Sequence, residues 1–244
     1  MGIGEVIHPG SASRTMDYAE PSRVGYLVAK RLLDITLSAV ALVLLAPLFL
    51  IIAIAIKLDS PGPVIFVQKR VRGGQDPNDP HPERNVFDFY KFRSMYVDAD
   101  QSLHRRYVLE YINGNTQKIN NGDSHKPLYK MRNDPRVTRV GRLLRRTSLD
   151  ELPQLYNVLK GDMSLVGPRP ALPYEVEQYD AFHRQRLIPQ AGLTGLWQVS
   201  GRTTLTFEEM VRLDIEYLQK RSFWFDLKIL LKTLPAILSA DGAW

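Results

Sequence analysis

The sequence predicts a helix-dominated α+β protein in which a re-entrant membrane helix precedes a polar, mainly helical domain. Three observations lead to this prediction. A run of 22 uncharged residues over 35–56 contains a proline, two short segments rich in β-branched and aromatic residues follow it, and the rest of the chain has several stretches with the apolar period of a helix. No internal repeat is visible, so a repeat architecture is not expected.

Residues 1–29 are the first predicted unit, a mobile N-terminal extension. They contain Gly, Ser, Pro and mixed charges without an apolar period, and they lack the hydrophobic stretch and cleavage-like end of a signal peptide. We therefore expect no packed structure there.

The apolar run and its flanks are the second predicted unit, residues 30–59. As a straight helix the run would extend about 33 Å, at about 1.5 Å per residue, which is enough to cross a bilayer. Pro47 removes a backbone hydrogen-bond donor near the middle of the run. Lys30 and Arg31 flank one end and Lys57 the other, so the positive-inside rule does not show which end would face the cytoplasm. A kinked helix that enters one leaflet and returns keeps both basic ends at the cytoplasmic headgroups. We favour it over the alternative, a single span with a tolerated proline.

Residues 60–244 are the third predicted unit. Strands are expected at 64–68 and 86–92, joined by a polar, proline-containing surface loop over 73–85. Helices are expected at 98–112, 139–146, 148–160, 173–186, 206–220 and 223–238. The last helix has an apolar face from Phe223 to Leu238 but carries three charged residues, so it either lies in the membrane interface as an amphipathic helix or packs on the domain.

Composition excludes several classes of site. The chain has no cysteine, which rules out disulfides, thiolate zinc sites and cysteine nucleophiles, and its five histidines have no metal-ligand spacing. The net charge of +6 indicates an anionic partner, and a nucleotide, a phospholipid surface or a nucleic acid would each satisfy it. There is neither a Walker motif nor a G-x-G-x-x-G motif.

A dense basic segment occupies 130–146. Its seven cations stand against the single acid Asp134, and they are Lys130, Arg132, Arg136, Arg139, Arg142, Arg145 and Arg146. Such a density of guanidinium groups can hold phosphates by charge-assisted hydrogen bonds. The alternative is a solvated basic face that contacts anionic lipid.

The adjacent acids Asp150 and Glu151 follow this segment directly. Ser148 and Glu151 fit the S-x-x-E capping box at a helix start, which is a structural explanation, although Pro153 sits poorly just beyond the first turn. A carboxylate can also act as a nucleophile toward phosphorus where arginines and a divalent cation neutralise the phosphate oxygens. Mg²⁺ suits such a site because it binds one or two carboxylates together with substrate phosphates.

Two further residues and one segment are candidates for a functional or structural role. Arg169 lies between two prolines, a stiff mount for an anion-binding guanidinium or simply a structural turn. The segment 192–202, GLTGLWQVSGR, has the glycines of a loop that approaches a nucleotide closely. Asp214 falls within the apolar stripe of the helix at 206–220, where a structural ion pair is the favoured explanation.

Taken together, the motifs resemble those of the bacterial sugar transferases, the monotopic polyprenyl-phosphate phosphoglycosyl transferases, over 30–244. Those that carry the resemblance are KRLLD at 30–34, the proline-broken apolar helix, SPGPVIFVQKRV at 60–71, YKFRSM at 90–95, DPRVTRVGRLLRRTSLDELPQLYNVLKGDMSLVGPRP at 134–170 and GLTGLWQVSGR at 192–202. The form of this last loop, together with the segment from Phe223, is most similar to the hexose transferases of exopolysaccharide and O-antigen pathways.

The resemblance implies a re-entrant helix, a catalytic domain on the cytoplasmic face of the bacterial inner membrane, and Mg²⁺ held by Asp150 and Glu151. It implies that Asp150 becomes linked to a phosphosugar with Glu151 as its partner. Substrate contacts are expected at Lys91, Arg145, Arg169, Gln198 and Arg202. The implied partners are a UDP-sugar donor, a polyprenyl (undecaprenyl) phosphate acceptor and a phospholipid membrane, with no nucleic acid, while a homo-oligomer is left open.

Two departures and two alternatives accompany the resemblance. Ala46 precedes Pro47 where the family often has serine, and Ala191 precedes Gly192 where proline is usual. Extra N-terminal membrane helices, frequent in this subgroup, are not present, so we expect either a minimal enzyme or a catalytic fragment. The alternatives are a glycosyltransferase that uses the D-x-D at 98–100 and a catalytically silent membrane scaffold.

Overall fold

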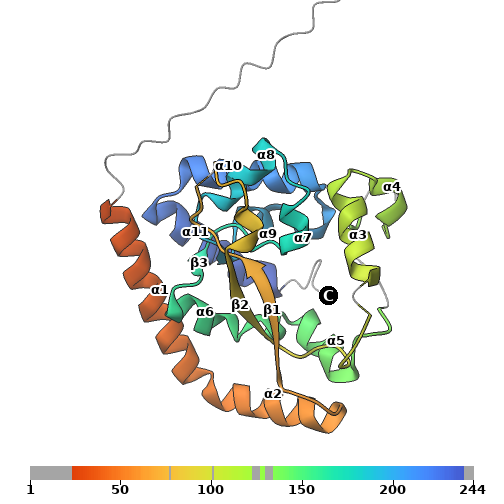
Figure 1. The fold of residues 1–244 in the computed structure, drawn as a ribbon. Coiled ribbons are helices and arrows are strands. Elements are labelled where there is room, and N and C mark those ends of the chain that lie inside the picture. The colour runs from red at the N-terminus through yellow and green to blue at the C-terminus, as the bar shows by residue number, and fades with distance from the viewer. Residues whose placement is uncertain (1–23, 77, 101, 123–126, 130–133, 239–244) are drawn as a thin grey trace, which may run out of the picture.

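The computed structural model describes residues 24–76, 78–100, 102–122, 127–129 and 134–238 (Figure 1). Its α-helices are α1 (Val24–Leu44), α2 (Ala46–Asp59), α3 (Ser102–Ile112), α4 (Thr116–Ile119), α5 (Arg139–Arg146), α6 (Gln154–Lys160), α7 (Pro173–Val176), α8 (Ala181–Arg184), α9 (Leu196–Ser200), α10 (Phe207–Lys220) and α11 (Phe223–Leu238). Its strands are β1 (Ile65–Val71), β2 (Val86–Phe92), β3 (Ser164–Val166) and β4 (Gly192–Thr194). Short 3-10 turns occur at Pro82–Arg84, Leu149–Glu151, Gln185–Leu187 and Arg202–Thr204. The predicted helix-dominated α+β class is confirmed, and most of the predicted extension lies outside the described residues.

The apolar run forms two helices, α1 and α2, which are bent by 60° relative to each other. The break falls at Leu45 because Pro47 has no N–H and is accommodated in the first turn of α2, where none is needed. α1 begins before the predicted start at Lys30, since the apolar period continues toward the N-terminus. Among the described residues no single helix is long and apolar enough to cross a membrane, whereas α1 and α2 taken together pass that test.

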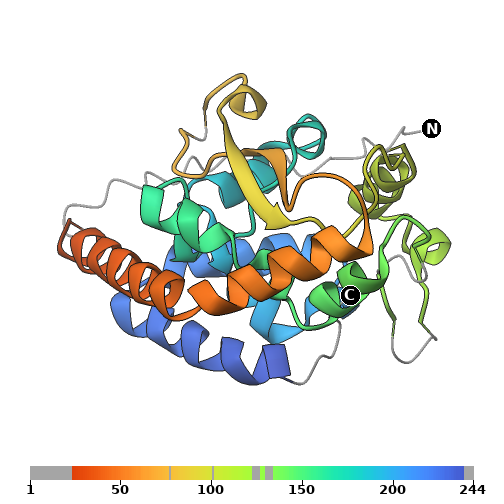
Figure 2. The ribbon, with the colours of Figure 1, turned by 90° about the horizontal axis from the view of Figure 1, so that it is seen from below.

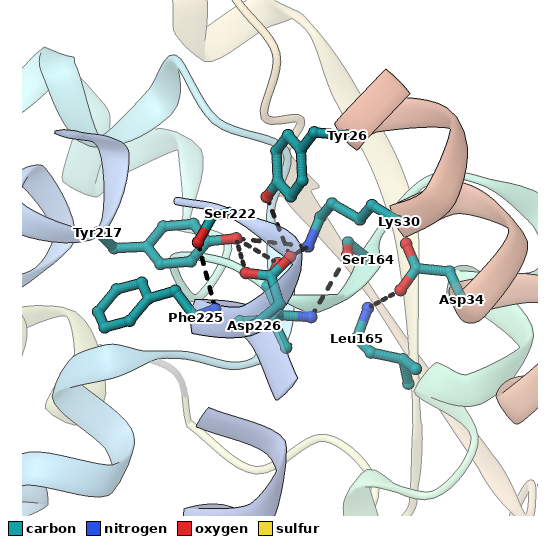
Figure 3. Close-up of polar contacts among 10 residues, drawn as sticks. Tyr26, Lys30, Asp34, Ser164, Leu165, Tyr217, Ser222, Phe225 and Asp226 are labelled. Carbon is teal, nitrogen blue, oxygen red and sulfur yellow. Dashed lines mark hydrogen bonds and ion pairs between the residues drawn. The ribbon is translucent and has the colours of Figure 1, made fainter. Parts of the chain in front are cut away.

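Lys30 on α1 is buried against the domain (Figure 3). Its Nζ lies 2.7 Å from Asp226 Oδ2 on α11 and donates to the carbonyl oxygen of Val166 at 2.8 Å. The hydroxyls of Tyr26 and Tyr217 donate to the same carboxylate at 3.0 and 2.9 Å. The charge of Lys30 is therefore neutralised inside the protein, and the position of the basic ends at the cytoplasmic headgroups stays a prediction.

The next polar residues of α1 also bind the domain. Arg31 donates to the carbonyl oxygens of Val158 and Leu159 at 2.7 and 2.8 Å, at the C-terminal end of α6, where a cation is favourable. Asp34 accepts a hydrogen bond from Leu165 N at 2.9 Å, at β3 (Figure 3). One face of α1 is thereby fixed to α6, β3 and α11.

The C-terminal end of α2 is attached to the same domain by Arg93, which follows β2 and is 4% exposed. Its guanidinium donates to the carbonyl oxygen of Ser60 at 2.6 Å and to that of Pro61. β2 pairs with β1 in an antiparallel register that sets Lys91 opposite Phe66. Both ends of the bent helix pair are thus held by one folded unit.

Three predicted helices differ from those observed. The helix expected at 98–112 is shorter, because the Asp100 carboxylate accepts from Ser102 N at 2.7 Å and α3 starts there. The helix expected at 148–160 is divided at Pro153 into a 3-10 turn and α6. The helix expected at 173–186 is interrupted because Asp180 caps a new helix, α8, by accepting from His183 N at 2.8 Å.

The parallel pair β3 and β4 was not predicted, since three residues are too few to show an alternation. The backbones of the two segments come so close that a Cβ on Gly192 would collide with the backbone of Gly167, and one on Gly195 would lie 2.5 Å from Gly167 O. These glycines are needed for that backbone contact, while the approach of this loop to a nucleotide stays a prediction.

α11 lies beside α1 in Figure 2, α2 continues from α1 beyond the bend, and all three helices carry exposed apolar side chains. α11 packs on the domain through Asp226 and Ile229, and its predicted apolar face is divided, since Leu227 and Leu230 are half-buried while Leu231 and Leu234 are 62% and 63% exposed. The large apolar side chains exposed on the three helices, which we call the apolar face, are Val24, Leu27, Val28, Leu32, Ile35, Leu37, Val40, Val43, Leu44, Leu50, Ile51, Ile54, Leu58, Trp224, Leu231 and Leu234. A surface of this extent is typical of contact with lipid or with another protein.

Candidate active site

Lys91 is placed by the alternation of β2. Phe87 and Phe89 point into the core, and Lys91, two residues further on, continues that face. The outer edge of β2 is fixed to α6 by the buried amide of Asn157, which accepts from Tyr90 N at 3.1 Å and donates to Asp88 O at 2.6 Å. β2 and α6 therefore hold Lys91 in a set position relative to the acids that precede α6.

Asp150 and Glu151 lie on the 3-10 turn before α6. Ser148 adopts a left-handed conformation with φ of 57°, and its side chain makes no capping hydrogen bond. The predicted capping box is therefore wrong, since Glu151 points away from the helix start toward two cations. Asp150 is 6% exposed. A strained residue beside a buried acid and a half-buried one is a pattern often found at functional sites.

Glu151 is held by Lys91 and Arg169. Its Oε1 accepts from Lys91 Nζ at 3.1 Å and from Arg169 Nη2 at 2.5 Å, and its Oε2 accepts from Arg169 Nη1 at 3.1 Å. Asp150 Oδ2 lies 3.8 Å from Lys91 Nζ, too far for a hydrogen bond. One acid is thus doubly paired and the other is not.

The backbone around Arg169 is held by hydrogen bonds as well as by its two flanking prolines. Arg70 donates to the carbonyl oxygen of Pro170 at 3.0 Å, and Arg186 donates to that of Arg169 at 3.5 Å. Arg186 in turn forms an ion pair of 2.9 Å with Asp214, which confirms the predicted structural ion pair. Burial raises the pKa of Asp214 to about 6, although Arg186 opposes that rise.

The two acids have opposite pKa shifts. Burial raises the pKa of the Asp150 carboxyl above its ordinary value, and the nearby charge of Lys91 offsets only part of the rise. Burial also acts on Glu151, but Arg169 and Lys91 outweigh it and hold the pKa of that carboxyl far below its usual range. Glu151 is therefore a fixed anion, while Asp150 is the carboxylate whose charge is poorly compensated.

All seven predicted site residues border one pocket of about 450 Å³. They are Lys91, Arg145, Asp150, Glu151, Arg169, Gln198 and Arg202. They come from β2, α5, the 3-10 turn before α6, the segment after β3, and α9 with its following turn. A volume of this size suits a small-molecule substrate.

The basic segment divides in the structure. Arg145 borders the pocket, whereas Arg139, Arg142 and Arg146 are exposed on the outside of α5. Arg136 forms an ion pair with Asp134 at 2.7 Å. Lys130 and Arg132 lie outside the described residues. Of the described cations in this segment, Arg145 is thus the one positioned for a phosphate in the pocket.

Several pocket residues were not predicted as site residues. One of them is Trp197 on α9, whose indole Nε1 is buried without a hydrogen-bond partner among the described residues, as is amide Oε1 of the neighbouring Gln198, which was predicted. Both atoms belong to residues that line the pocket, so a substrate or water there could satisfy them. The remaining unpredicted lining residues are Ser148, Leu152, Leu155, Leu165, Leu193, Thr194, Thr203, Leu230, Thr233 and Ala236. The leucines and α11 residues gave no signal in the sequence, because they look like ordinary core positions.

The D-x-D at 98–100 does not border this pocket. Asp100 uses both carboxylate oxygens on Ser102, accepting from its N and from its Oγ at 2.7 and 2.6 Å. The helix-start explanation accounts for Asp100, and nothing in the geometry favours the glycosyltransferase alternative.

The residues present fit Mg²⁺ only in part. Among the described residues no three His, Asp or Glu side chains converge on a common point, and both oxygens of Glu151 are engaged by cations. Asp150 retains uncommitted oxygens. The donor set suits an ion that takes one carboxylate here and completes its shell with substrate phosphate and water, as Mg²⁺ does.

Known sequences resemble the chain over most of its length. Residues 25–240 match the family described as bacterial sugar transferase. The chain is 42% identical over 223 residues to galactosyl transferase CpsE of Streptococcus agalactiae (91% of this chain, 44% of that protein) and 41% identical over 216 residues to undecaprenyl-phosphate galactose phosphotransferase of Salmonella typhimurium (88% and 41%). It is 38% identical over 218 residues to exopolysaccharide production protein ExoY of Rhizobium meliloti (89% and 88%). The chain thus spans less than half of the first two relatives and most of the third.

Proposed function

Because the chain belongs to the bacterial sugar transferase family, we propose that it transfers a hexose 1-phosphate from a UDP-sugar to polyprenyl phosphate. The products are polyprenyl-diphosphate-sugar and UMP, and the acceptor is undecaprenyl phosphate. Galactose or glucose is the expected hexose, in agreement with the names of two relatives that mention galactose. The reaction is the initiating step of exopolysaccharide, capsule or O-antigen synthesis.

The observation that carries the proposal is the contrast between the two adjacent acids. Glu151 is neutralised by Lys91 and Arg169, so its oxygens are poor nucleophiles. Asp150 is buried at the pocket wall and its charge is only partly compensated, which is the condition of an activated carboxylate. The neighbouring cations are placed to hold the phosphate oxygens that an anionic nucleophile must approach.

In the proposed reaction an Asp150 oxygen attacks the phosphorus that bears the sugar. The new P–O bond forms as the bond to the bridging oxygen of UMP breaks, and UMP leaves with the electron pair. The phosphate of the lipid acceptor then attacks the same phosphorus and releases the Asp150 carboxylate. Lys91, Arg145 and Arg169 hold phosphate oxygens in both steps, and Glu151 fixes the positions of Lys91 and Arg169.

Asp150, with the substrate diphosphate, is the group in this pocket that would hold Mg²⁺. When bound, the ion supplies charge neutralisation at the phosphate oxygens. Glu151, committed to its two cations, contributes to this electrostatic setting rather than a direct metal bond.

We further propose that α1 and α2 form a re-entrant element in the cytoplasmic leaflet of the bacterial inner membrane. The support is that Lys30 near one end and Ser60 after the other are bound to the same domain, through Asp226 and Arg93. A single span would require that domain to lie on both sides of the bilayer. The apolar face provides the lipid contact, and it keeps the pocket beside an acceptor that cannot leave the bilayer.

The test is nucleotide release by the detergent-solubilised protein with undecaprenyl phosphate, Mg²⁺ and a panel of UDP-sugars. UMP formed with UDP-galactose or UDP-glucose is the expected result. UDP would indicate transfer of the sugar alone, and release of neither nucleotide from any donor would support the scaffold.

A further inference from the structure

The pocket has a polar side and an apolar side. The polar side carries the acids and cations of the proposed reaction. The apolar side, which we call the leucine wall, consists of Leu152, Leu155, Leu165, Leu193, Leu230 and Ala236. The leucine wall combines residues from α6, its preceding turn, β3, β4 and α11, and two of its members, Leu155 and Leu165, are also buried in the core.

The leucine wall continues toward the bend of the helix pair. Leu152, Leu193 and Leu230 belong to a hydrophobic cluster that also contains Leu42 and Leu45, at the junction of α1 and α2. Leu44, beside them, is 73% exposed on the apolar face. Apolar packing therefore runs without interruption from the catalytic pocket to the part of the chain proposed to enter the membrane.

A UDP-sugar does not account for this wall. Its uracil, ribose, diphosphate and hexose are all polar or charged, and an apolar lining leaves their hydrogen-bonding groups unsatisfied. The acceptor has the matching chemistry, because a phosphate is joined directly to a branched hydrocarbon chain. Its phosphate complements Lys91, Arg145 and Arg169, and its first isoprene units complement leucine side chains.

We propose that the leucine wall binds the phosphate-proximal isoprene units of the lipid acceptor, with Leu230 and Ala236 of α11 as its outer border. This rests on the proposed function and names the acceptor subsite within the same pocket. Leu230 and Ala236 are specificity-determining residues for the acceptor, and they play no part in the attack of Asp150 on the donor.

The two half-reactions separate the acceptor from the donor. UMP released in a single turnover without acceptor measures donor binding and Asp150 attack. Transfer to farnesyl phosphate, compared with ethyl phosphate, measures how much the hydrocarbon chain adds. The variants are Leu230→Asn, which makes the wall polar, and Ala236→Leu, which narrows it and keeps a good helix former. Leu103→Asn, 45% exposed on α3, is the matched control.

For Leu230→Asn and Ala236→Leu we expect a single-turnover UMP release within about twofold of the parent and a KM for farnesyl phosphate raised about tenfold or more. The preference for farnesyl over ethyl phosphate should fall by a similar factor, and Leu103→Asn should change none of these values. The UMP release also reports correct folding of each variant.

An unchanged KM for farnesyl phosphate in both variants would overturn the proposal. So would a raised KM for the UDP-sugar with an unchanged acceptor KM, since the wall would then belong to the donor. Failure of the parent protein to release UMP from any UDP-sugar is a distinct result, which overturns the proposed function and this subsite with it.

Discussion

Arg169 binds Glu151 through two hydrogen bonds, of 2.5 and 3.1 Å, that join both guanidinium Nη atoms to both carboxylate oxygens. The sequence separates the two residues by a helix, a strand and a proline-flanked turn. This pair fixes Glu151 as an anion and leaves its neighbour Asp150 as the uncommitted acid of the pocket.

Arg169→Lys is expected to lower kcat/KM for the UDP-sugar by about 10- to 100-fold. A lysine keeps the charge but cannot make the two-pronged contact, and loss of a charge-assisted hydrogen bond costs about 1.5–3 kcal/mol. Steady-state UMP release measures the effect. Arg142→Lys, on the exposed side of α5, is the control and should behave as the parent. Equal activity of the two variants would contradict the role given to Arg169.

Asp150→Asn is expected to abolish turnover, by about 10³-fold or more, and to stabilise the protein. The folded-state pKa of Asp150 is raised, so the folded protein binds this proton more tightly than the unfolded chain does, and stability falls as pH rises from the ordinary carboxyl pKa through the raised one. The buried charge is therefore unfavourable at neutral pH, and Asn removes it. We expect a higher Tm for Asp150→Asn than for the parent at pH 7. The gain should shrink as the pH is lowered through the raised pKa, and a Tm below that of the parent at pH 7 would contradict this.

The acid limb of the pH–rate profile should report Asp150. The nucleophile must be ionised, so the rate falls as pH drops through its raised pKa, above the ordinary range of an aspartate. Lys91 lowers the pKa of Asp150, so Lys91→Met should move this limb to higher pH as well as reduce the rate. Single-turnover UMP release from pH 4.5 to 8 measures both. A limb that stays in place in Lys91→Met would assign it to another group.

Breaking the buried Lys30–Asp226 pair should cost about 3–5 kcal/mol, because either single substitution leaves a buried charge without its partner. Lys30→Met and Asp226→Leu are therefore each destabilising, and the double variant should recover much of the loss. Lys69→Met breaks an exposed pair with Asp88 and should cost at most about 1 kcal/mol. Chemical unfolding in detergent compares them, and additive losses in the double variant would contradict this interpretation.

The membrane topology can be tested with single cysteines, since the chain has none of its own. Lys57→Cys replaces an exposed polar residue at the end of α2, outside the apolar face, and Leu103→Cys marks the domain. In intact spheroplasts we expect no reaction of either with a membrane-impermeant maleimide, and reaction of both in inside-out vesicles. Labelling of Lys57→Cys from the periplasmic side would establish a single span instead.

The pattern of apolar residues in the sequence predicted the bounds of three elements correctly. α5, α11 and β2 begin and end at the expected residues, because their apolar periods are strong. β3 and β4 are too short for such a signal, and the division of 173–186 depends on the cap at Asp180. Pairing between residues far apart in the sequence leaves no local pattern, which is why the pairing of Lys30 with Asp226 was not predicted.

Some residues of the candidate site could be predicted from the sequence, and others could not. Spacing alone favoured a capping role for Glu151, and the family resemblance brought Lys91, Asp150 and Arg169 into one site. The position of Asp214 in an apolar stripe showed that it needs a partner. That this partner is Arg186 could be seen only in the structure. The apolar side of the pocket was hidden, because a leucine that lines a pocket and one in a core have the same pattern.

The most direct measurement is to mix the protein with its UDP-sugar in the absence of acceptor, quench, digest and analyse the peptides by mass spectrometry. A hexose-phosphate adduct on Asp150, absent from Asp150→Asn and discharged by added undecaprenyl phosphate, is the predicted result. An adduct on Glu151, or transfer to lipid that proceeds with Asp150→Asn, would contradict the assignment of Asp150 as the nucleophile.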